Sequence, residues 1–233
     1  MRLESLESRR LFSVTVYESY PGFYQIEGDD SDEVISVSVS MNEETFTVDG
    51  GTYTGVGYIF INAHGGNDSV SVTSTDGSGY IGASILAGDG SDTVSLNFDG
   101  AIWGGRGNDQ INLADSFRGE VYGEEGNDRM TIRGACVNAE IRGGDGNDYI
   151  DCSGNDYGVV VFAGTGNDTV FGSAHDDSIY AEEGHDKVSG GAGNDTIYVR
   201  DGGGDEVDGG DGYDFIYADA NETNIGGAEA VYT

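Results

Sequence analysis

The tripeptide Gly-Asn-Asp recurs seven times in this chain of 233 residues, and this repetition constrains the fold more than any other feature. The copies begin at Gly66, Gly107, Gly126, Gly146, Gly154, Gly166 and Gly193. Most lie in a longer unit that reads small-Gly-x-Gly-Asn-Asp-x-apolar, as in residues 104–111 and 143–150. A unit of this length can bury its apolar residue only against neighbouring copies of itself. The sequence therefore predicts a solenoid, in which successive copies stack along one axis.

The residues of the unit indicate a turn that is rich in oxygen ligands. Glycines allow backbone angles that side chains forbid, so the first half predicts a tight turn, and the apolar residue after the aspartate begins a strand. Such a turn presents carbonyl oxygens and one carboxylate. These hard ligands suit calcium far better than zinc or copper. Asparagine at the fifth position is expected to shape the turn and not to bind metal through its side chain.

The unit resembles the nonapeptide repeat of the RTX (repeats-in-toxin) family, whose members form calcium-dependent β-rolls. The best match is residues 163–171, followed directly by 172–180, 181–189 and 190–198. The resemblance covers about residues 63–217. It implies that the aspartate at the sixth position of each unit is a carboxylate ligand, and that main-chain carbonyls of the same turns complete the calcium shell.

The spacing of the sixth-position aspartates predicts how the chain winds. From Asp168 to Asp195 the steps are nine residues, so two units make one turn of about eighteen residues, with acidic loops at both edges. Between Asp68 and Asp168 the steps are 24, 17, 19, 20 and 20, so only one edge carries the glycine-rich loop there. The expected fold class is all-β, a parallel β-roll or β-solenoid with about 17–20 residues per turn and stacked calcium loops.

Apolar residues support this winding independently of the turns. One predicted inward column stands just before the loops: Ile61, Ile85, Ile102, Val121, Ile141, Val161, Ile179 and Val188. A second column follows the aspartates: Val70, Val94, Ile111, Met130, Ile150 and Val170. Alternation along the upstream strands adds a third: Val72, Leu96, Leu113, Ile132 and Cys152. Continuous ladders of β-branched residues are what a thin parallel core requires.

The charge of the chain indicates that folding depends on bound cations. Against 10 basic residues stand 43 acidic ones, which gives a formal net charge of −33, and 41 glycines add further entropy to the unfolded chain. The candidate calcium ligands are Asp68, Asp92, Asp109, Asp128, Asp148, Asp168, Asp186 and Asp205 on one edge and Asp177, Asp195 and Asp214 on the other. If neighbouring loops share an ion, about six to eight calcium ions are expected. Their binding energy would then appear as folding energy.

Composition also argues against several other classes of site. Nothing basic is available to meet phosphate, which disfavours nucleic acid as a partner. No apolar run reaches the length of a membrane span. A disulfide between Cys136 and Cys152 is not expected, because stacking does not bring their positions together. The three histidines, His64, His175 and His185, lack the spacing of a zinc motif and are expected to replace turn residues.

The chain divides into four predicted segments. Residues 1–16 indicate a leader or a disordered N-terminus. Residues 17–62 are expected to form irregular N-terminal coils and a cap, with Asp32 two solenoid turns before Asp68. Residues 63–217 are the RTX-type calcium-binding β-roll, and 218–233 form a C-terminal cap that closes the last strand edge.

A calcium-dependent structural or interaction module is the predicted function. The chain would be disordered at low cytosolic calcium and would fold where calcium is millimolar, which places it outside a bacterium or on its surface. No enzymatic activity is expected, because RTX enzymes keep catalysis in separate domains and this chain has no room for one. Outward aromatic residues just before the loops, Trp103, Tyr122, Phe162 and Tyr180, indicate either a stacked ladder or a face for a glycan or another protein chain.

Two alternative functions also use calcium on a solenoid. An ice-binding solenoid resembling bacterial adhesins would need flat rows of threonine, but the third loop position reads Gly65, Asp89, Arg106, Glu125, Asp145, Thr165 and Glu183. A β-helix polysaccharide lyase would use calcium together with an arginine base. Four arginines lie near the aspartate loops: Arg106, Arg129, Arg133 and Arg142. Surface ion pairs are the commoner role for such residues.

Overall fold

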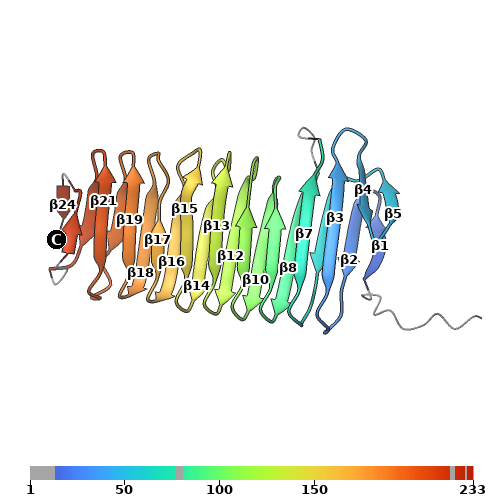
Figure 1. Ribbon diagram of the computed structural model, residues 1–233, viewed down its shortest axis with the longest axis horizontal. Helices are drawn as coiled ribbons and strands as arrows, with labels where there is room; N and C mark the ends of the chain where they lie inside the picture. The colour runs from blue at the N-terminus through green and yellow to red at the C-terminus, as the bar shows by residue number, and fades with distance from the viewer. Residues whose placement is uncertain (1–13, 77–80, 221–223, 229, 233) are drawn as a thin grey trace, which may run out of the picture.

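The computed structural model describes residues 14–76, 81–220, 224–228 and 230–232, which form strands and connecting loops without a helix. Each turn of the chain adds one strand to each of two sheets, and together the sheets form a rod whose axis runs across the strands (Figure 1). The expected all-β parallel β-solenoid is thereby confirmed. The predicted leader, residues 1–16, lies almost wholly outside the described residues, and the segment boundaries stay predictions.

Two sheets with the same number of strands make up the rod. Sheet A contains, in spatial order, β1 (Thr15–Tyr20), β2 (Phe23–Glu27), β6 (Tyr58–Asn62), β8 (Gly82–Asp89), β10 (Gly100–Arg106), β12 (Gly119–Glu125), β14 (Glu140–Asp145), β16 (Val160–Gly166), β18 (Ser178–Gly184), β20 (Thr196–Val199), β22 (Phe215–Ala218) and β24 (Ala230–Tyr232). Sheet B contains β23 (Asn224–Gly226), β21 (Glu206–Asp211), β19 (Lys187–Ala192), β17 (Thr169–Phe171), β15 (Tyr149–Asn155), β13 (Arg129–Gly134), β11 (Gln110–Leu113), β9 (Thr93–Leu96), β7 (Ser69–Ser74), β3 (Val34–Ser40), β4 (Thr45–Val48) and β5 (Gly51–Thr54).

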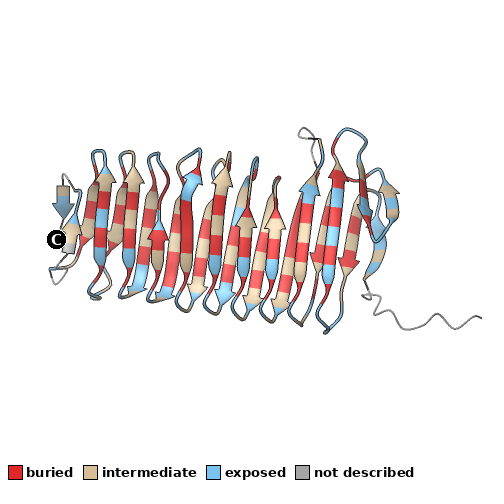
Figure 2. Ribbon diagram, in the orientation of Figure 1, coloured by how far each residue is buried: buried red, intermediate tan, exposed pale blue. Residues whose placement is uncertain are grey.

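The core is a thin layer of aliphatic side chains between the sheets. Buried and exposed residues alternate along most strands, as the banding in Figure 2 shows, because successive side chains of a strand point to opposite faces. Parallel pairing places each predicted column in register, for example Ile102 beside Val121 in sheet A and Ile111 beside Met130 in sheet B. Full burial of one such side chain stabilises the fold by about 1.5–3 kcal/mol. The core is therefore the sum of many small contributions along the rod.

One predicted column assignment is wrong. Val188 does not continue the sheet A column after Ile179, which goes on instead to Ile197. Val188 lies in sheet B between Val170 and Val207. Where the repeats are nine residues long, successive units alternate between the two sheets, so the residue before a loop changes sheet at every unit.

The N-terminal end departs from the expected winding. Val34 of β3 pairs directly with Ser69 of β7, so one turn separates these coils and not two. The intervening chain leaves the roll as an antiparallel meander of β3, β4 and β5. Its second hairpin turns at Asp49-Gly50, where both residues have positive φ, the conformation that this dipeptide favours in two-residue hairpins. The meander lengthens the chain here without adding a coil.

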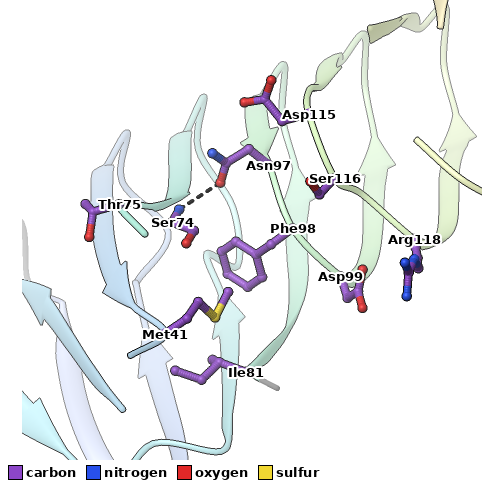
Figure 3. Close-up of a pocket in the computed structure, with 10 residues that line it drawn as sticks. All are labelled: Met41, Ser74, Thr75, Ile81, Asn97, Phe98, Asp99, Asp115, Ser116 and Arg118. Carbon is purple, nitrogen blue, oxygen red and sulfur yellow. Dashed lines mark hydrogen bonds between the residues drawn. The ribbon is translucent and has the colours of Figure 1, made fainter. Parts of the chain in front are cut away.

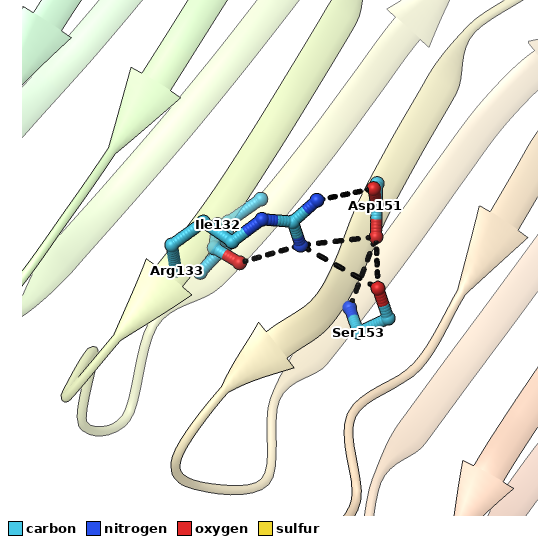
Figure 4. A network of polar contacts seen from close by, with 4 residues as sticks. All are labelled: Ile132, Arg133, Asp151 and Ser153. Atoms are coloured by element: carbon cyan, nitrogen blue, oxygen red, sulfur yellow. Dashed lines mark hydrogen bonds and ion pairs between the residues drawn. The ribbon is translucent and has the colours of Figure 1, made fainter.

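The third apolar column contains a bulge between β13 and β15. Register shifts there between Thr131 and Arg133. The guanidinium of Arg133 bridges the irregularity by donating to both carboxylate oxygens of Asp151, at 2.6 and 3.2 Å (Figure 4). This hydrogen bonding lowers the pKa of Asp151 to about 2. Cys152 follows within the bulge and, like Cys136, is a buried free thiol.

A ladder of stacked side chains runs along the outer face of sheet A. Trp103 stacks on Tyr122 with ring centroids 5.7 Å apart, and Arg142 then lies 4.2 Å from the centroid of the Phe162 ring. The stack continues from Phe162 to Tyr180, Tyr198, Tyr217 and Tyr232 with centroids 4.6–5.0 Å apart. Arginine therefore substitutes for a ring where the sequence pattern has a break, and most ring faces are covered by their neighbours.

The turn glycines permit coils to stack more closely than any side chain would allow. Gly146 has φ of +134°, and a β-carbon there would overlap the carbonyl oxygen of Gly126 in the preceding coil. Gly146→Ala is expected to destabilise the protein by more than about 4 kcal/mol, because strain and overlap act together. Thermal unfolding followed by circular dichroism measures this. Gly57→Ala is the control, since its nearest neighbour is Gly22 at 3.6 Å, and equal midpoints for the two variants would contradict the prediction.

Candidate metal centre

The structure gathers the predicted aspartates into two columns, one along each edge of the rod. The first acidic column comprises Asp68, Asp92, Asp109, Asp128, Asp148, Asp168, Asp186 and Asp205, each immediately before a strand of sheet B. The second comprises Asp177, Asp195 and Asp214, each immediately before a strand of sheet A. All of these residues are at most 3% exposed. Buried carboxylates require nearby positive charge, and the 10 basic residues of the chain are too few to supply it for all of them.

Hydrogen bonds link the members of each column from coil to coil. In the first column the main-chain N–H of each aspartate donates to Oδ1 of the next, at 2.7–2.8 Å, from Asp68 as far as Asp205. In the second column Asp177 and Asp195 donate in the same way to Asp195 and Asp214, at 2.8 Å. This pattern fixes every carboxylate in one orientation and leaves its second oxygen for another role.

The second carboxylate oxygen, Oδ2, is buried and lacks a hydrogen-bond partner in most of these aspartates. The members that share this feature are Asp68, Asp92, Asp109, Asp128, Asp148, Asp168, Asp186 and Asp195. Asp177 differs, because its Oδ2 accepts the main-chain N–H of Ser173 at 2.6 Å. An ionised buried oxygen without a partner costs several kcal/mol, so a repeated row of them is typical of a cation site.

Small residues at the start of the regular loops make room for these oxygens. A β-carbon on Gly104 would lie 2.5 Å from Oδ2 of Asp109 and 2.7 Å from the carbonyl oxygen of Gly123 in the next coil. Gly143 and Gly190 face the corresponding pair of oxygens, a carboxylate of their own loop and a carbonyl of the next coil. Carboxylate and carbonyl oxygens therefore converge at a position that glycine leaves open in these three loops.

Burial makes the carboxyl groups hard to ionise without a cation. It raises the pKa of Asp68, Asp128 and Asp168 to about 6, and that of Asp109, Asp148, Asp186 and Asp195 to about 7. For Asp148, the charges of Asp128 and Asp168 add to the effect of burial on the pKa. The main-chain N–H bond acts in the opposite direction but is the smaller influence. A cation beside Oδ2 would restore the ordinary ionised state.

The available ligands fit calcium. All are oxygens, some from carboxylates and some from main-chain carbonyls, and calcium accepts six to eight such ligands in flexible geometry. The members of the two acidic columns are all aspartates, so the columns present oxygen ligands and not the sulfur or nitrogen ligands that favour zinc. Carboxylate and carbonyl oxygens, the two kinds of ligand that the family resemblance implied, are both present in the loops.

Asparagines form a separate ladder on the outer side of the first acidic column. Oδ1 of Asn108 accepts the main-chain N–H of Asn127, and the pattern repeats from Asn127 to Asn147 and from Asn147 to Asn167, each at 2.7 Å. Oδ1 of each asparagine thus points toward the following coil, whereas Oδ1 of each column aspartate points toward the preceding coil. His185 occupies the next position, where its Nδ1 accepts the N–H of Gly204 at 3.0 Å. The asparagine oxygens are thus engaged with backbone, as expected for residues that shape the turn.

One residue at the start of the first acidic column escaped the sequence analysis. Glu33 is buried, its main-chain N–H donates to Oδ1 of Asp68 at 2.7 Å, and its Oε2 has no hydrogen-bond partner. Asp32, the residue singled out by the sequence, stands instead in the asparagine ladder and accepts the N–H of Asn67. The spacing of the apolar residues could have identified Glu33, because Ile35 follows Glu33 at the same distance as Val70 follows Asp68.

The triplet at Gly154 has no place in either column. Asn155 is buried at the edge opposite the first acidic column, where its side chain accepts the N–H of Cys136 at 3.0 Å and donates to the carbonyl oxygens of Cys136 and Tyr157. The same tripeptide therefore also serves a purely structural turn. The residue that donates to Oδ1 of Asp177, and so precedes it in the second acidic column, is Val159, three residues after this triplet's aspartate.

The four arginines near the loops are each engaged by a neighbouring side chain. Arg106 pairs with Glu125 at 3.3 Å, and Arg133 is held by Asp151. The guanidinium of Arg129 lies 4.0 Å from the centroid of the Tyr149 ring. Arg142 donates to Glu140 at 2.9 Å.

A cavity of about 500 Å³ lies away from both acidic columns. Figure 3 shows the side chains of Met41, Ile81 and Phe98 gathered on one side of it, with Asp115 and Arg118 further out. The main-chain N–H of Ser74 donates to Asn97 at 2.7 Å beside the cavity. No buried carboxylate of the two columns lines it.

Fold and site together define a parallel β-roll whose stacked loops are built to hold divalent cations. Comparison with protein families gives the particular kind: four segments, residues 101–115, 140–152, 161–198 and 200–222, match the model of the RTX calcium-binding nonapeptide repeat. This match confirms the resemblance seen in the sequence. Neither the curated proteins nor the solved structures gave a match.

Proposed function

We propose that the protein is a calcium-binding structural module whose roll folds when ions enter the gaps between stacked acidic loops. The row of buried Oδ2 atoms without hydrogen-bond partners is the observation that carries this proposal. Each ion would take carboxylates of the acidic columns together with loop carbonyls. About six to eight ions would then offset part of the net charge of −33, and their binding energy would become folding energy.

A folding reaction of this kind suits an extracellular or cell-surface protein of a bacterium. Low calcium inside the cell would leave the acidic, glycine-rich chain unfolded, and millimolar calcium outside would fold it. No helix in the described segments is long and apolar enough to cross a membrane. The resulting rod would act as a rigid spacer or as a module that presents surfaces to other molecules.

Three finer functions are less well supported than a structural role. Glycan binding by ring stacking would need free ring faces, but most faces in the sheet A ladder cover one another. Ice binding would need a regular uncharged row, whereas the third loop position contains the ion pair of Arg106 and Glu125. A lyase would need a free arginine beside the loops, and the four candidates are all engaged. We therefore infer a module without catalytic activity.

A calcium titration of chelated protein tests the proposal. Far-ultraviolet circular dichroism is expected to gain β-signal cooperatively at submillimolar to millimolar calcium, and equilibrium dialysis is expected to count about six to eight bound ions. Magnesium at the same concentrations is the control, because it demands stricter octahedral geometry than these loops offer. A chelated protein that already has the full β-signal would rule out calcium-driven folding.

A further inference from the structure

The last loop of the first acidic column is built differently from the others. In the regular loops the main-chain carbonyl of the third position accepts the N–H of the fourth-position glycine of the preceding coil, as from Gly126 to Asp145 and from Gly146 to Thr165, both at 2.7 Å. Between β20 and Asp205 the chain has an extra residue, because the step from Asp195 to Asp205 is ten and not nine. The regular carbonyl is therefore displaced.

The side chain of Asp201 takes the place of that carbonyl. Its Oδ2 accepts the N–H of Gly184 at 2.6 Å, which is the bond that a third-position carbonyl accepts elsewhere in the column. Its Oδ1 accepts the N–H of Gly203 at 2.7 Å, so the carboxylate is held in a fixed orientation within its own loop. A neutral main-chain oxygen has thus been replaced by an oxygen that carries formal charge.

This replacement brings a third carboxylate to one gap between coils. Ligand oxygens of Asp186, Asp201 and Asp205 lie within 4.8 Å of one another. Asp186 is 1% exposed, and its Oδ2 is buried without a hydrogen-bond partner. The other gaps of the column are flanked by two column carboxylates. Among the described residues, this is the group of three acidic side chains with the spacing of a metal site.

We propose that Asp201 is a calcium ligand in the gap between Asp186 and Asp205, and that this three-carboxylate gap binds calcium more tightly than any other gap of the first acidic column. The inference rests on the proposed calcium-dependent folding. Calcium affinity rises with the number of charged ligands, and this gap has three carboxylates. As the calcium concentration increases, the gap between Asp186 and Asp205 fills first. Ordering of the roll therefore begins near the C-terminal end of the roll.

Calcium binding by the full chain, measured in competition with a chromophoric chelator, tests the assignment. Asp201→Asn keeps an oxygen that can accept from Gly184 but removes the charge, and it is expected to weaken the tightest calcium class by about tenfold or more. The matched control is Asp211→Asn. Asp211 holds the third loop position on the opposite edge, where its main-chain carbonyl accepts the N–H of Gly193, and its exposed side chain faces no gap of the first column.

The outcomes separate this inference from the proposed function. Wild-type protein that binds no calcium would refute both. Identical isotherms for D201N and D211N, with calcium-driven folding intact, would overturn the role of Asp201 alone. If D201N does not reach the wild-type β-signal in saturating calcium, Asp201→Glu is the deciding variant. This variant retains the charge and is expected to bind calcium more tightly than D201N. Equal weakening of calcium binding in both variants would overturn the assignment.

Discussion

Asp148→Asn is expected to remove calcium from the two gaps that flank this residue and to lower the thermal midpoint of the calcium-loaded protein by about 10 °C. Asparagine keeps an oxygen that can accept the N–H of Asp128, so the ladder can persist. It replaces Oδ2 by an amide nitrogen, however, and that group cannot ligate a cation. Loss of one partner from a buried ionic contact costs roughly 3–5 kcal/mol. Equilibrium dialysis and thermal unfolding measure the two effects.

A charge on the same loop provides the control for this substitution. Asp145 is exposed, and its carboxylate accepts from the hydroxyl of Thr165, at 3.1 Å. Asp145→Asn removes the same charge and is expected to leave the calcium count unchanged. In chelated protein D148N is expected to be at least as folded as D145N, because it removes a buried charge that no ion neutralises there. An equal number of bound ions in D148N and D145N would show that column aspartates are not ligands.

Metal-free protein is expected to gain β-structure as the pH is lowered from 8 to 5. The column aspartates have a pKa of about 6 to 7 in the folded roll, raised from an ordinary value near 4 in the unfolded chain. The folded state therefore binds more protons than the unfolded state between these values. The stability that proton binding by these aspartates contributes is fully present below about pH 4. It is lost as the pH rises through about 6 to 7.

Calcium reverses this dependence because it binds the ionised carboxylates. The calcium concentration at half-folding is expected to rise as the pH falls through 7, since protons then compete with the ion. Circular dichroism in chelator, recorded from pH 8 to 5, tests the first effect, and calcium titrations at the two limits test the second. A metal-free spectrum that does not change over this range would contradict the burial of ionisable oxygens in the folded roll.

Much of the fold could be predicted from periodicity alone. The regular steps between aspartates determine which loops stack, and the apolar residues at fixed distances from them determine which side chains face inward. Both signals repeat, so an error at one coil is corrected by its neighbours. Parallel pairing of Ile111 with Met130 and the ladder from Asp109 to Asp128 follow directly from the two spacings.

What the sequence analysis missed lies where the repeat is interrupted. The meander of β4 and β5 is a local hairpin structure, and a count of residues per turn read it as an extra coil. Glu33 differs in residue type from the other members of its column. Asp201 acts through a side chain in place of a main-chain atom, a substitution that spacing cannot reveal. Each case depends on the geometry of one coil and not on the period.

Coil length is absorbed almost entirely at the edge opposite the first acidic column. Steps between its aspartates range from 17 to 24 residues, yet the hydrogen bonds between them stay at 2.7–2.8 Å. The N-terminal meander extends this tolerance to a whole added hairpin. Evolution can therefore lengthen single coils or add hairpins at this edge while the spacing of the acidic loops is preserved. The loop between β13 and β14, where Asn138 is exposed, would therefore accept a grafted peptide. The rod would hold that peptide at a fixed position along its axis.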